Sequence, residues 1–251
     1  MGLFDSGKSR RRPVIWGKFT VPHNLSNYHY FATGAAGSGK SSLLRILYRS
    51  VLKDVVNKDL DTRAFFYDQK GEAYPDLVNL ELKDETIITN PFDSRCSAWD
   101  MADDIRTDGD AKEVAAVMVP PIEGTNKYFH DAAALMLAKA IQCFIRLRPN
   151  RDWTFRDIIL ACSNVLDLKV LCEKAKLSEI EPIDDFLDKS RESKSVGMTL
   201  TVENSKYSVI AAAWEKARGN GQTFSLKNWV SGKGPQILLV GYSDDYPTAL
   251  A

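Results

Sequence analysis

The chain has 251 residues, of which 44% are hydrophobic and 26% are charged, and this composition excludes a disordered or fibrous chain and predicts one large globular domain or two smaller ones. Lys plus Arg number 33, as do Asp plus Glu, so the formal net charge is zero. This balance excludes a global attraction to nucleic acid or anionic membrane, so such contacts require a local patch or an oligomeric ring.

The four cysteines do not follow the spacing of a metal site or a redox motif. None of them forms a C-x-x-C pair, and no His lies at metal-ligand spacing from them. We therefore expect free thiols in a reducing compartment rather than a zinc site or a disulfide framework. The four positions are Cys96, Cys143, Cys162 and Cys172.

The N-terminal region is predicted to be an arm followed by a short β-ribbon. Residues 1–12 end in three consecutive arginines, and Pro13 follows them in place of the apolar core of a signal peptide. We expect a flexible, solvated basic arm there. Residues 13–27 indicate a short β-ribbon or extended lead-in, broken by Gly17 and Pro22. The sequence has no run of about 18 apolar residues that would predict a transmembrane helix.

The most informative stretch, residues 34–41, reads GAAGSGKS and fits the phosphate-binding pattern G-x-x-x-x-G-K-[S/T]. Its glycines allow unusual backbone dihedrals and a close approach to phosphates, and its N–H groups can form a nest around an anion. Lys40 can reach the β- and γ-phosphates, and the Ser41 hydroxyl can hold Mg²⁺. We therefore predict ATP and Mg²⁺ as cofactors. The predicted binding residues are Thr33, Gly34, Ala35, Ala36, Gly37, Ser38, Gly39, Lys40, Ser41 and Ser42.

The segments around this loop have the character that the motif requires. Residues 28–33 are aromatic and β-prone, so we expect a strand. Residues 43–56 carry apolar side chains at helical spacing. The alternative interpretation is a Gly-rich turn with an accidental lysine, and the strand–loop–helix order argues against it.

An acidic residue follows the next apolar run. Residues 62–68 predict a second parallel strand, which the preceding helix would join as a crossover. Asp68 would then lie at the carboxyl end of a strand beside the loop, where open α/β sheets bind ligands. With Lys40 it is our predicted catalytic residue, acting on Mg²⁺ through water or orienting the attacking water. The alternative is a helix N-cap or turn-forming Asp; Glu72 is a weaker candidate of the same kind.

The remaining elements complete an α/β fold. Residues 86–89 predict a third short strand, and residues 236–241 predict a returning buried strand. Between about 93 and 218 helical patterns dominate without a clear strand, and Thr154 with Asp157 suggests a capped helix. Residues 224–230 predict a short helix or turn. The expected fold class is a P-loop NTPase (RecA-like) parallel sheet, incomplete, with an all-α insertion domain.

We predict four segments along the chain. They are a flexible basic arm (1–12), the first part of a nucleotide-binding domain (13–92), an all-α insertion domain (93–218) and a return to the nucleotide-binding domain (219–251).

With these residues placed, the sequence resembles the type IV secretion coupling proteins, which are DNA-transfer ATPases related to FtsK and HerA. Besides the phosphate loop, FYDQKGE at residues 66–72 is similar to the family's apolar-apolar-D-x-x-G-[DE] strand end. NPFDSR at 90–95, followed by Trp99, is similar to the N-P-[FLY]-D-x-R block that enters an all-α domain. Residues 232–250 resemble the strand and loop leaving that insert, so the resemblance spans about residues 14–251.

Two departures from the family shape our expectation of activity. The family usually carries N-terminal membrane helices and a Walker B strand ending in Asp-Glu, and neither is recognisable here. Asp244 and Asp245 lie in a turn-like stretch instead. We therefore expect a fragment, or one half of a split protein, truncated before Walker B. Such a chain would bind nucleotide but hydrolyse it poorly, because it lacks the acid that activates water.

The resemblance implies a ring, expected to be a hexamer, that uses ATP to deliver DNA or DNA–protein substrates to a type IV secretion or conjugation channel. DNA would be held through its phosphates without sequence preference, and the all-α domain would meet a relaxase or effector protein. A neighbouring subunit would supply an arginine to the γ-phosphate; Arg95 and Arg191 are candidates, with surface ion pairs as the alternative. The expected location is cytoplasmic, at the inner face of a bacterial membrane through a missing anchor or a partner such as the secretion channel.

Two other functions remain open. A nucleotide-binding recruitment module would bind a relaxase or effector without efficient hydrolysis, and the unrecognised Walker B acids favour it. A DNA-pumping ATPase of chromosome segregation or phage packaging is the other, and the NPFDSR block argues against it.

Overall fold

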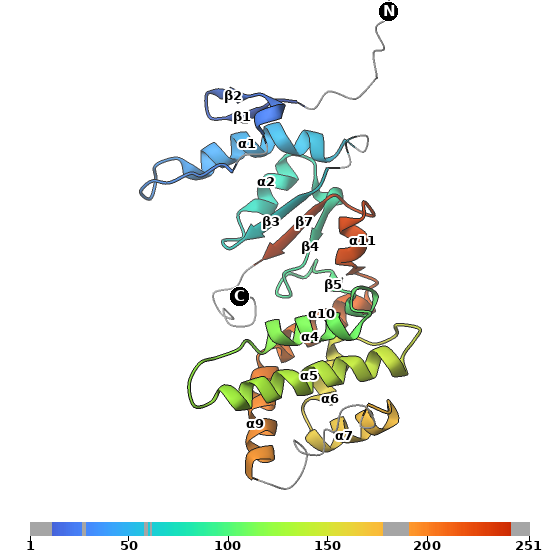
Figure 1. Cartoon of the computed structure of the whole chain (residues 1–251). Helices are drawn as coiled ribbons and strands as arrows, with labels where there is room; N and C mark the ends of the chain where they lie inside the picture. The colour runs from blue at the N-terminus through green and yellow to red at the C-terminus, as the bar shows by residue number, and fades with distance from the viewer. Residues whose placement is uncertain (1–11, 27–28, 58–59, 61, 178–190, 242–251) are drawn as a thin grey trace, which may run out of the picture. The chain divides into compact units, whose positions relative to one another are not determined.

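The computed structural model describes residues 12–26, 29–57, 60, 62–177 and 191–241. Their contacts divide the chain into two units (Figure 1). The sheet unit comprises the described residues up to Thr89 together with those from Asn228 onward, and the helical unit comprises those within Asn90–Lys227.

The sheet unit is built on three parallel strands. β3 (Ala64–Asp68) and β4 (Thr86–Ile88) both pair in parallel with β7 (Ile237–Gly241), which gives the order β3-β7-β4. The central strand β7 is therefore the last in sequence, and its residues Ile237–Leu239 are buried. These pairings confirm the three strands predicted at 62–68, 86–89 and 236–241, and with them the parallel α/β class.

Two helices cover this sheet. α1 (Lys40–Val55) is the helix predicted after the Gly-rich loop, and α2 (Ala73–Asn79) follows β3. The crossover expected of α1 is not observed, because the described residues before it form no strand of this sheet. Leu52 and Val55 of α1 meet Leu77 of α2 and Ile237 of β7 in the core of the unit. Short 3-10 turns occur at His23–Leu25 and Lys83–Glu85.

A β-hairpin lies against α1. β1 (Val14–Trp16) pairs antiparallel with β2 (Phe19–Val21), as expected for a short ribbon at 13–27. The backbone N–H of Ile15 donates to Ser50 Oγ of α1 at 3.0 Å. Gly17 forms the turn with φ 61°, a left-handed conformation that glycine adopts at little cost.

A strand is expected at residues 28–33, but residues 29–33 do not form one. Residue 28 lies outside the described residues, and residues 29–33 pair with no described strand; Phe31 is 85% exposed. A β-prone sequence becomes a strand only where a neighbouring strand offers hydrogen-bond partners.

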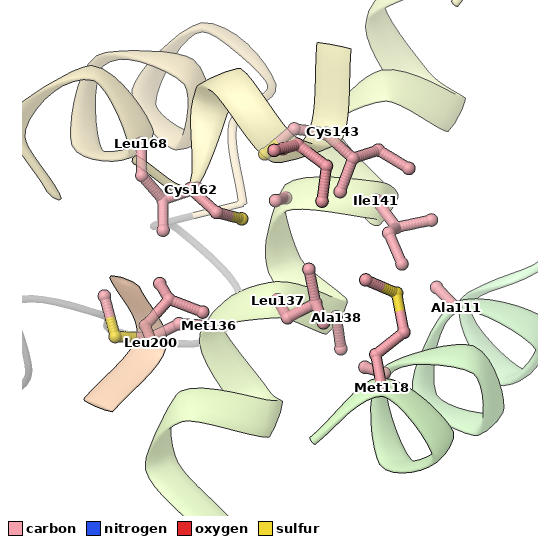
Figure 2. Close-up of a cluster of buried hydrophobic side chains, with 14 of the residues drawn as sticks. Ala111, Met118, Met136, Leu137, Ala138, Ile141, Cys143, Cys162, Leu168 and Leu200 are labelled. Carbon is pink, nitrogen blue, oxygen red and sulfur yellow. The ribbon is translucent and has the colours of Figure 1, made fainter. Parts of the chain in front are cut away.

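The helical unit is arranged around one long buried helix, α5 (Lys127–Leu147). Ala133, Ala140, Ile141 and Cys143 of α5 have no exposed surface. Side chains from α4, α7 and α9 converge on it (Figure 2). The other helices of this unit are α3 (Met101–Asp104), α4 (Asp108–Met118), α6 (Phe155–Ala161), α7 (Val165–Lys174), α9 (Arg191–Ser205) and α10 (Ser208–Gly219).

The predicted cap of α6 is present. Thr154 Oγ1 accepts from Asp157 N at 3.3 Å, and Asp157 Oδ2 accepts from Thr154 N at 2.7 Å. This reciprocal pair satisfies two backbone donors at the start of the helix, and Asp serves at a position where Glu or Gln is commoner.

The expectation of a helical insert without strands needs one correction. β5 (Ala98–Trp99) and β6 (Thr223–Phe224) pair in parallel inside the helical unit. Strands of two residues are too short to show period-two alternation, so periodicity could not reveal them. α11 (Leu226–Val230) follows β6 and confirms the short helix predicted at 224–230.

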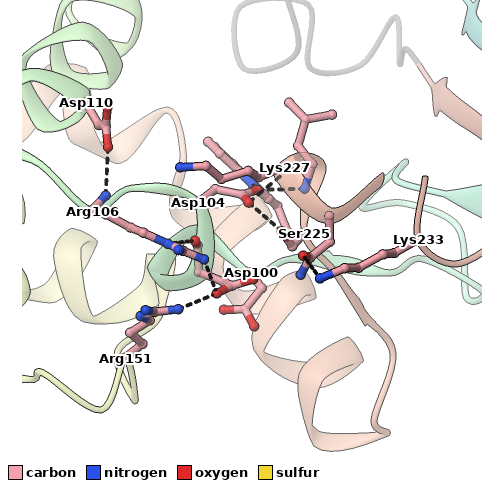
Figure 3. Close-up of polar contacts among 12 residues, drawn as sticks. Asp100, Asp104, Arg106, Asp110, Arg151, Ser225, Lys227 and Lys233 are labelled. Atoms are coloured by element: carbon pink, nitrogen blue, oxygen red, sulfur yellow. Dashed lines mark hydrogen bonds and ion pairs between the residues drawn. The ribbon is translucent and has the colours of Figure 1, made fainter. Parts of the chain in front are cut away.

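A carboxylate on α3 holds the end of the helical unit (Figure 3). Asp104 accepts hydrogen bonds from Trp99 Nε1 at 2.5 Å, from Ser225 Oγ at 2.5 Å, and from the backbone N–H groups of Leu226 at 2.6 Å and Lys227 at 3.1 Å. One side chain thereby links β5 and α3 to the residues that follow β6, which lie more than a hundred positions away in sequence.

The four cysteines are buried free thiols. Within the described part of the chain, no cluster of His, Cys, Asp or Glu side chains is suited to hold a metal ion. No helix described here is both long enough and apolar enough to cross a bilayer.

The Asp104 hydrogen bonds predict a stability effect. Asp104→Ala should lower the free energy of unfolding by about 2 kcal/mol, because it leaves an indole N–H and two backbone N–H groups without their acceptor. Glu113→Ala, an exposed position on α4, is the matched control and should change stability by less than about 0.5 kcal/mol. Urea denaturation monitored by circular dichroism measures both, and equal midpoints for the two variants would contradict the role of Asp104.

Candidate nucleotide-binding site

The Gly-rich loop reaches α1 through two left-handed glycines. Gly37 has φ 75°, and Gly39, the N-cap of α1, has φ 85°. A residue with a Cβ is disfavoured there by about 1–2 kcal/mol. At Gly34 the restriction is steric, because a Cβ would lie 2.5 Å from Ser38 Oγ. These glycines are therefore required by the conformation of the loop itself.

The side chain of Lys40 makes two hydrogen bonds to the backbone of the loop. It is the first residue of α1, and its Nζ donates to the carbonyl oxygens of Gly34 at 2.8 Å and Ala35 at 2.7 Å. Ser38 N donates to Ala35 O at 3.2 Å and completes the turn. The ammonium group therefore reaches across the loop to the residues at which it begins.

The predicted binding residues lie at the surface of the sheet unit. Residues 33–39, Ser41 and Ser42 are exposed, and Lys40 is partly exposed. An exposed loop at the start of a helix presents backbone N–H groups that the helix itself leaves unsatisfied, and the positive end of the helix dipole favours an anion there.

A hollow of about 340 Å³ opens beside the loop, between the start of α1 and the carboxyl end of β3. Lys40 and Ser41 line it together with Asp68, so the structure brings the predicted catalytic pair and the predicted metal ligand to one hollow. Of the other eight predicted residues, Thr33 to Gly39 form the loop and Ser42 belongs to α1, and none of them lines this hollow. Its volume lies at the lower end of the range for ligand pockets.

Asp68 makes the contacts of a helix cap. Its Oδ1 accepts from Glu72 N at 3.1 Å and its Oδ2 from Ala73 N at 2.8 Å. This is the alternative role that the sequence left open for Asp68. Each carboxylate oxygen keeps a further lone pair, so a water-mediated contact to a metal ion stays a prediction. Glu72 occupies the N-cap position of α2 and lines the same hollow.

Tyr48 also lines the hollow, although the sequence analysis did not single it out. Its ring packs edge-on against Phe66, with centroids 5.1 Å apart. Burial raises the pKa of the Tyr48 phenol, and the negative charges of Asp68 and Asp76 add to that effect. Tyr48 therefore remains a neutral hydrogen-bonding group. Ser41, Leu44 and Tyr48 lie one helical turn apart on α1, so the helical period could have indicated it.

An ion pair joins the two helices that flank the hollow. Arg45 Nε of α1 lies 2.9 Å from both carboxylate oxygens of Asp76 on α2. The hydrogen bond to Asp76 raises the pKa of Arg45. This contact ties α2, whose start is capped by Asp68, to the helix that carries Lys40.

Of the two candidate arginines, the structure describes the side chain of Arg95. Arg95 belongs to the helical unit and makes a bidentate ion pair with Asp93, with Nε–Oδ1 at 2.8 Å and NH2–Oδ2 at 2.6 Å. That contact corresponds to the surface ion pair considered as its alternative. The side chain of Arg191, and both Asp244 and Asp245, lie outside what the structure describes.

A family model for the type IV secretion-system coupling protein DNA-binding domain matches residues 13–251. The chain belongs to this family. The match confirms the resemblance inferred from the phosphate loop, the DQKGE turn and the NPFDSR block.

Known coupling proteins extend the comparison. Coupling protein TraD of Escherichia coli (strain K12) is 22% identical over 201 residues, which cover 79% of this chain and 25% of TraD. The unbound monoclinic form of the conjugative coupling protein TrwBdeltaN70 matches with a TM-score of 0.65 and 20% identity, covering 93% of this chain and 50% of that one.

A structure of plasmid coupling protein TrwB in complex with ADP and Mg²⁺ matches with a TM-score of 0.65 and 19% identity, covering 94% of this chain and 52% of that chain. These likenesses show a shared fold. The present chain spans about half the length of the TrwB structures and a quarter of TraD.

The loop geometry predicts opposite effects for two glycine substitutions. Gly39→Ala should destabilise the chain by about 1–2 kcal/mol, because alanine is strained at φ 85°. Gly109→Ala, inside α4, should stabilise it by up to about 1 kcal/mol, because a Cβ there makes only an ordinary contact of 3.6 Å with Thr107 Oγ1. Thermal unfolding compares the two variants, and a shift of the same sign in both would refute the left-handed role of Gly39.

Proposed function

We propose that this chain is the nucleotide-binding portion of an ATP-driven coupling protein that delivers DNA or DNA–protein substrates to a type IV secretion or conjugation channel. One observation carries the proposal: Lys40 and Ser41 of the Gly-rich loop share a hollow with Asp68 in a chain that matches the coupling-protein family over residues 13–251. TrwB, which has the same fold, is described in complex with ADP and Mg²⁺ and with an ATP analogue.

The residues present fit a nucleoside triphosphate. The loop is exposed and precedes a helix, and its glycines hold the left-handed turns that bring backbone N–H groups close to an anion. Lys40 Nζ, which already spans the loop, would exchange its two carbonyl acceptors for phosphate oxygens. Ser41 Oγ would hold Mg²⁺, which supplies positive charge between the phosphates. The remaining predicted loop residues, Thr33 to Gly39 and Ser42, would surround the phosphates.

The contacts of the carboxylates that line the hollow favour slow hydrolysis of ATP. Both oxygens of Asp68 already accept backbone hydrogen bonds, and Asp76 is held by Arg45. Asp68 would therefore act through a bound water rather than as a free base. Glu72 and Asp76 are the other carboxylates that line the hollow. A general base raises a reaction rate by about 10²–10⁴-fold. Because its hydrogen bonds restrict Asp68 as a base, the chain would bind ATP but hydrolyse it slowly.

The assembly and its partners belong to the same proposal. The full motor would be a hexameric ring, anchored at the inner face of a bacterial membrane and joined to the secretion channel. The helical unit would serve as the insertion domain that meets a relaxase or effector protein, and DNA would be held through its phosphates. Arg95, which is forked onto Asp93, is poorly suited to reach a neighbouring subunit's γ-phosphate.

A second candidate is a recruitment module, in which ATP binding sets the conformation without efficient turnover. The capping role of Asp68 favours it, because that carboxylate stabilises α2 whether or not nucleotide is hydrolysed. The family match over residues 13–251 argues against a motor of chromosome segregation or phage packaging.

Nucleotide binding tests the shared basis of both candidates. Lys40→Ala should weaken binding of a fluorescent ATP analogue by about 10- to 100-fold, as expected for the loss of a charged hydrogen-bonding group. Lys53→Ala, at the exposed far end of α1, is the control and should bind as the wild type does. Absence of binding by the wild-type chain would count against both functions.

Turnover then separates the two candidates. ATP hydrolysis is measured with and without DNA, for this chain and for a version extended by the following coding sequence. DNA-stimulated hydrolysis that Lys40→Ala abolishes supports the motor. Binding without hydrolysis in both versions supports the recruitment module.

A further inference from the structure

The helical unit has a second hollow, of about 370 Å³, that is not part of the nucleotide site. It lies between the NPFDSR block and the C-terminal end of α10. The side chains that matter for its chemistry are Phe92, Asp93, Ser94, Lys216, Asn220 and Gln222.

A rigid turn presents an aromatic ring to this hollow. Phe92 is 39% exposed and lines the hollow, so part of its ring is accessible there. Phe92 N donates to Asn90 Oδ1 at 3.0 Å, and Asp93 N donates to Asn90 O at 3.0 Å. Cys96, which is buried, closes the turn by donating from its backbone N–H to Asp93 O at 3.0 Å. The backbone that carries the ring is therefore fixed by hydrogen bonds before any ligand binds, which lowers the entropic cost of ordering this turn on binding.

The charge of the hollow comes from one lysine. The carboxylate of Asp93 would repel an anion, but Arg95 neutralises its charge and donates three hydrogen bonds to it, of 2.9, 2.8 and 2.6 Å. These hydrogen bonds hold the pKa of Asp93 below its usual value. Lys216, in the last turn of α10, takes part in none of the ion pairs described for this chain, whereas Arg218 in the same turn pairs with Asp100 at 2.9 Å.

An aromatic ring, a lysine and several uncharged polar groups around one concave surface match the chemistry of a nucleotide unit. A base can stack on the ring whatever its identity, and a phosphate can pair with the lysine. Hydroxyl and amide groups can meet the sugar and the base edge. A specific protein interface takes about 20–30 residues from each partner, whereas ten residues line this hollow.

We propose that the hollow formed by Phe92, Ser94, Lys216, Asn220 and Gln222 binds one nucleotide of single-stranded DNA. The base stacks on Phe92 and the phosphate pairs with Lys216. The inference rests on the proposed function in DNA transfer. It assigns part of the contact with DNA to the turn that enters the helical unit. Binding there is independent of base sequence.

The test is fluorescence anisotropy of a labelled oligo(dT) bound by the chain over a range of salt concentrations. Phe92→Leu, which keeps apolar bulk without a ring, should weaken binding about 5- to 100-fold and leave the salt dependence unchanged. Phe92→Tyr keeps the ring and should bind as the wild type does. Lys216→Ala should weaken binding and reduce the slope of log K against log[salt] by about 0.7, the value for one phosphate of a single strand.

Two surface positions of the helical unit serve as matched controls. Tyr128→Leu removes an aromatic ring that is 54% exposed on α5, and Lys112→Ala removes an exposed lysine on α4. Both should bind oligo(dT) as the wild type does. Circular dichroism and thermal unfolding report that the helical unit of each variant remains folded.

The outcomes separate this inference from the proposed function. If the wild type binds oligo(dT) and Phe92→Leu and Lys216→Ala bind equally well, the hollow is not the contact, but the coupling function stands. Equal losses in Phe92→Tyr and Phe92→Leu would also overturn the inference, because stacking tolerates a hydroxyl group. If the wild type binds ATP but no oligo(dT), both this inference and the DNA-handling part of the proposed function fail.

Discussion

The sheet unit depends on the pairing of β7 with two strands that do not pair with each other. β3 and β4 each take their parallel ladder from β7, which the chain reaches only after the whole helical unit. Without β7 neither strand has a partner within the described sheet. The backbone hydrogen bonds of the sheet therefore depend on a contact across about 170 residues of sequence, and such long-range parallel pairing forms slowly because loop closure must precede it.

The helical unit, which separates β4 from β7 in sequence, has contacts of its own that join its two ends. Its first and last segments pair in parallel as β5 and β6, and Asp104 binds the residues just beyond β6. The two ends of the insertion are thus fixed within the unit itself, around a core centred on α5. Because each unit has its own buried core, a helical unit of this size can interrupt the sheet without taking part in its ladder.

The candidate nucleotide site combines a short sequence motif with residues of β3 and α2 that lie further along the chain. The loop and Lys40 follow directly from a short sequence, and their conformation depends on glycines at 34, 37 and 39. The opposite wall of the hollow comes from the end of β3 and the start of α2, where Asp68 caps the helix and Asp76 binds Arg45. One carboxylate stabilises the wall and faces the hollow at the same time. In the helical unit the NPFDSR block is likewise rigid through its own hydrogen bonds, and Arg95 neutralises Asp93 there.

The fold class, the positions of three strands, the helix after the Gly-rich loop, the cap at Thr154 and the family could be predicted from the sequence, because each depends on residues that are close in sequence or follow a regular period. Tertiary structure alone decided that residues 29–33 pair with no described strand, that β5 and β6 pair across the insertion, and that Asp68 caps α2. It also placed Tyr48 in the hollow beside Lys40. Strand pairing and the side chains that line a hollow depend on which partners lie nearby in space, and neither propensity nor spacing contains that information.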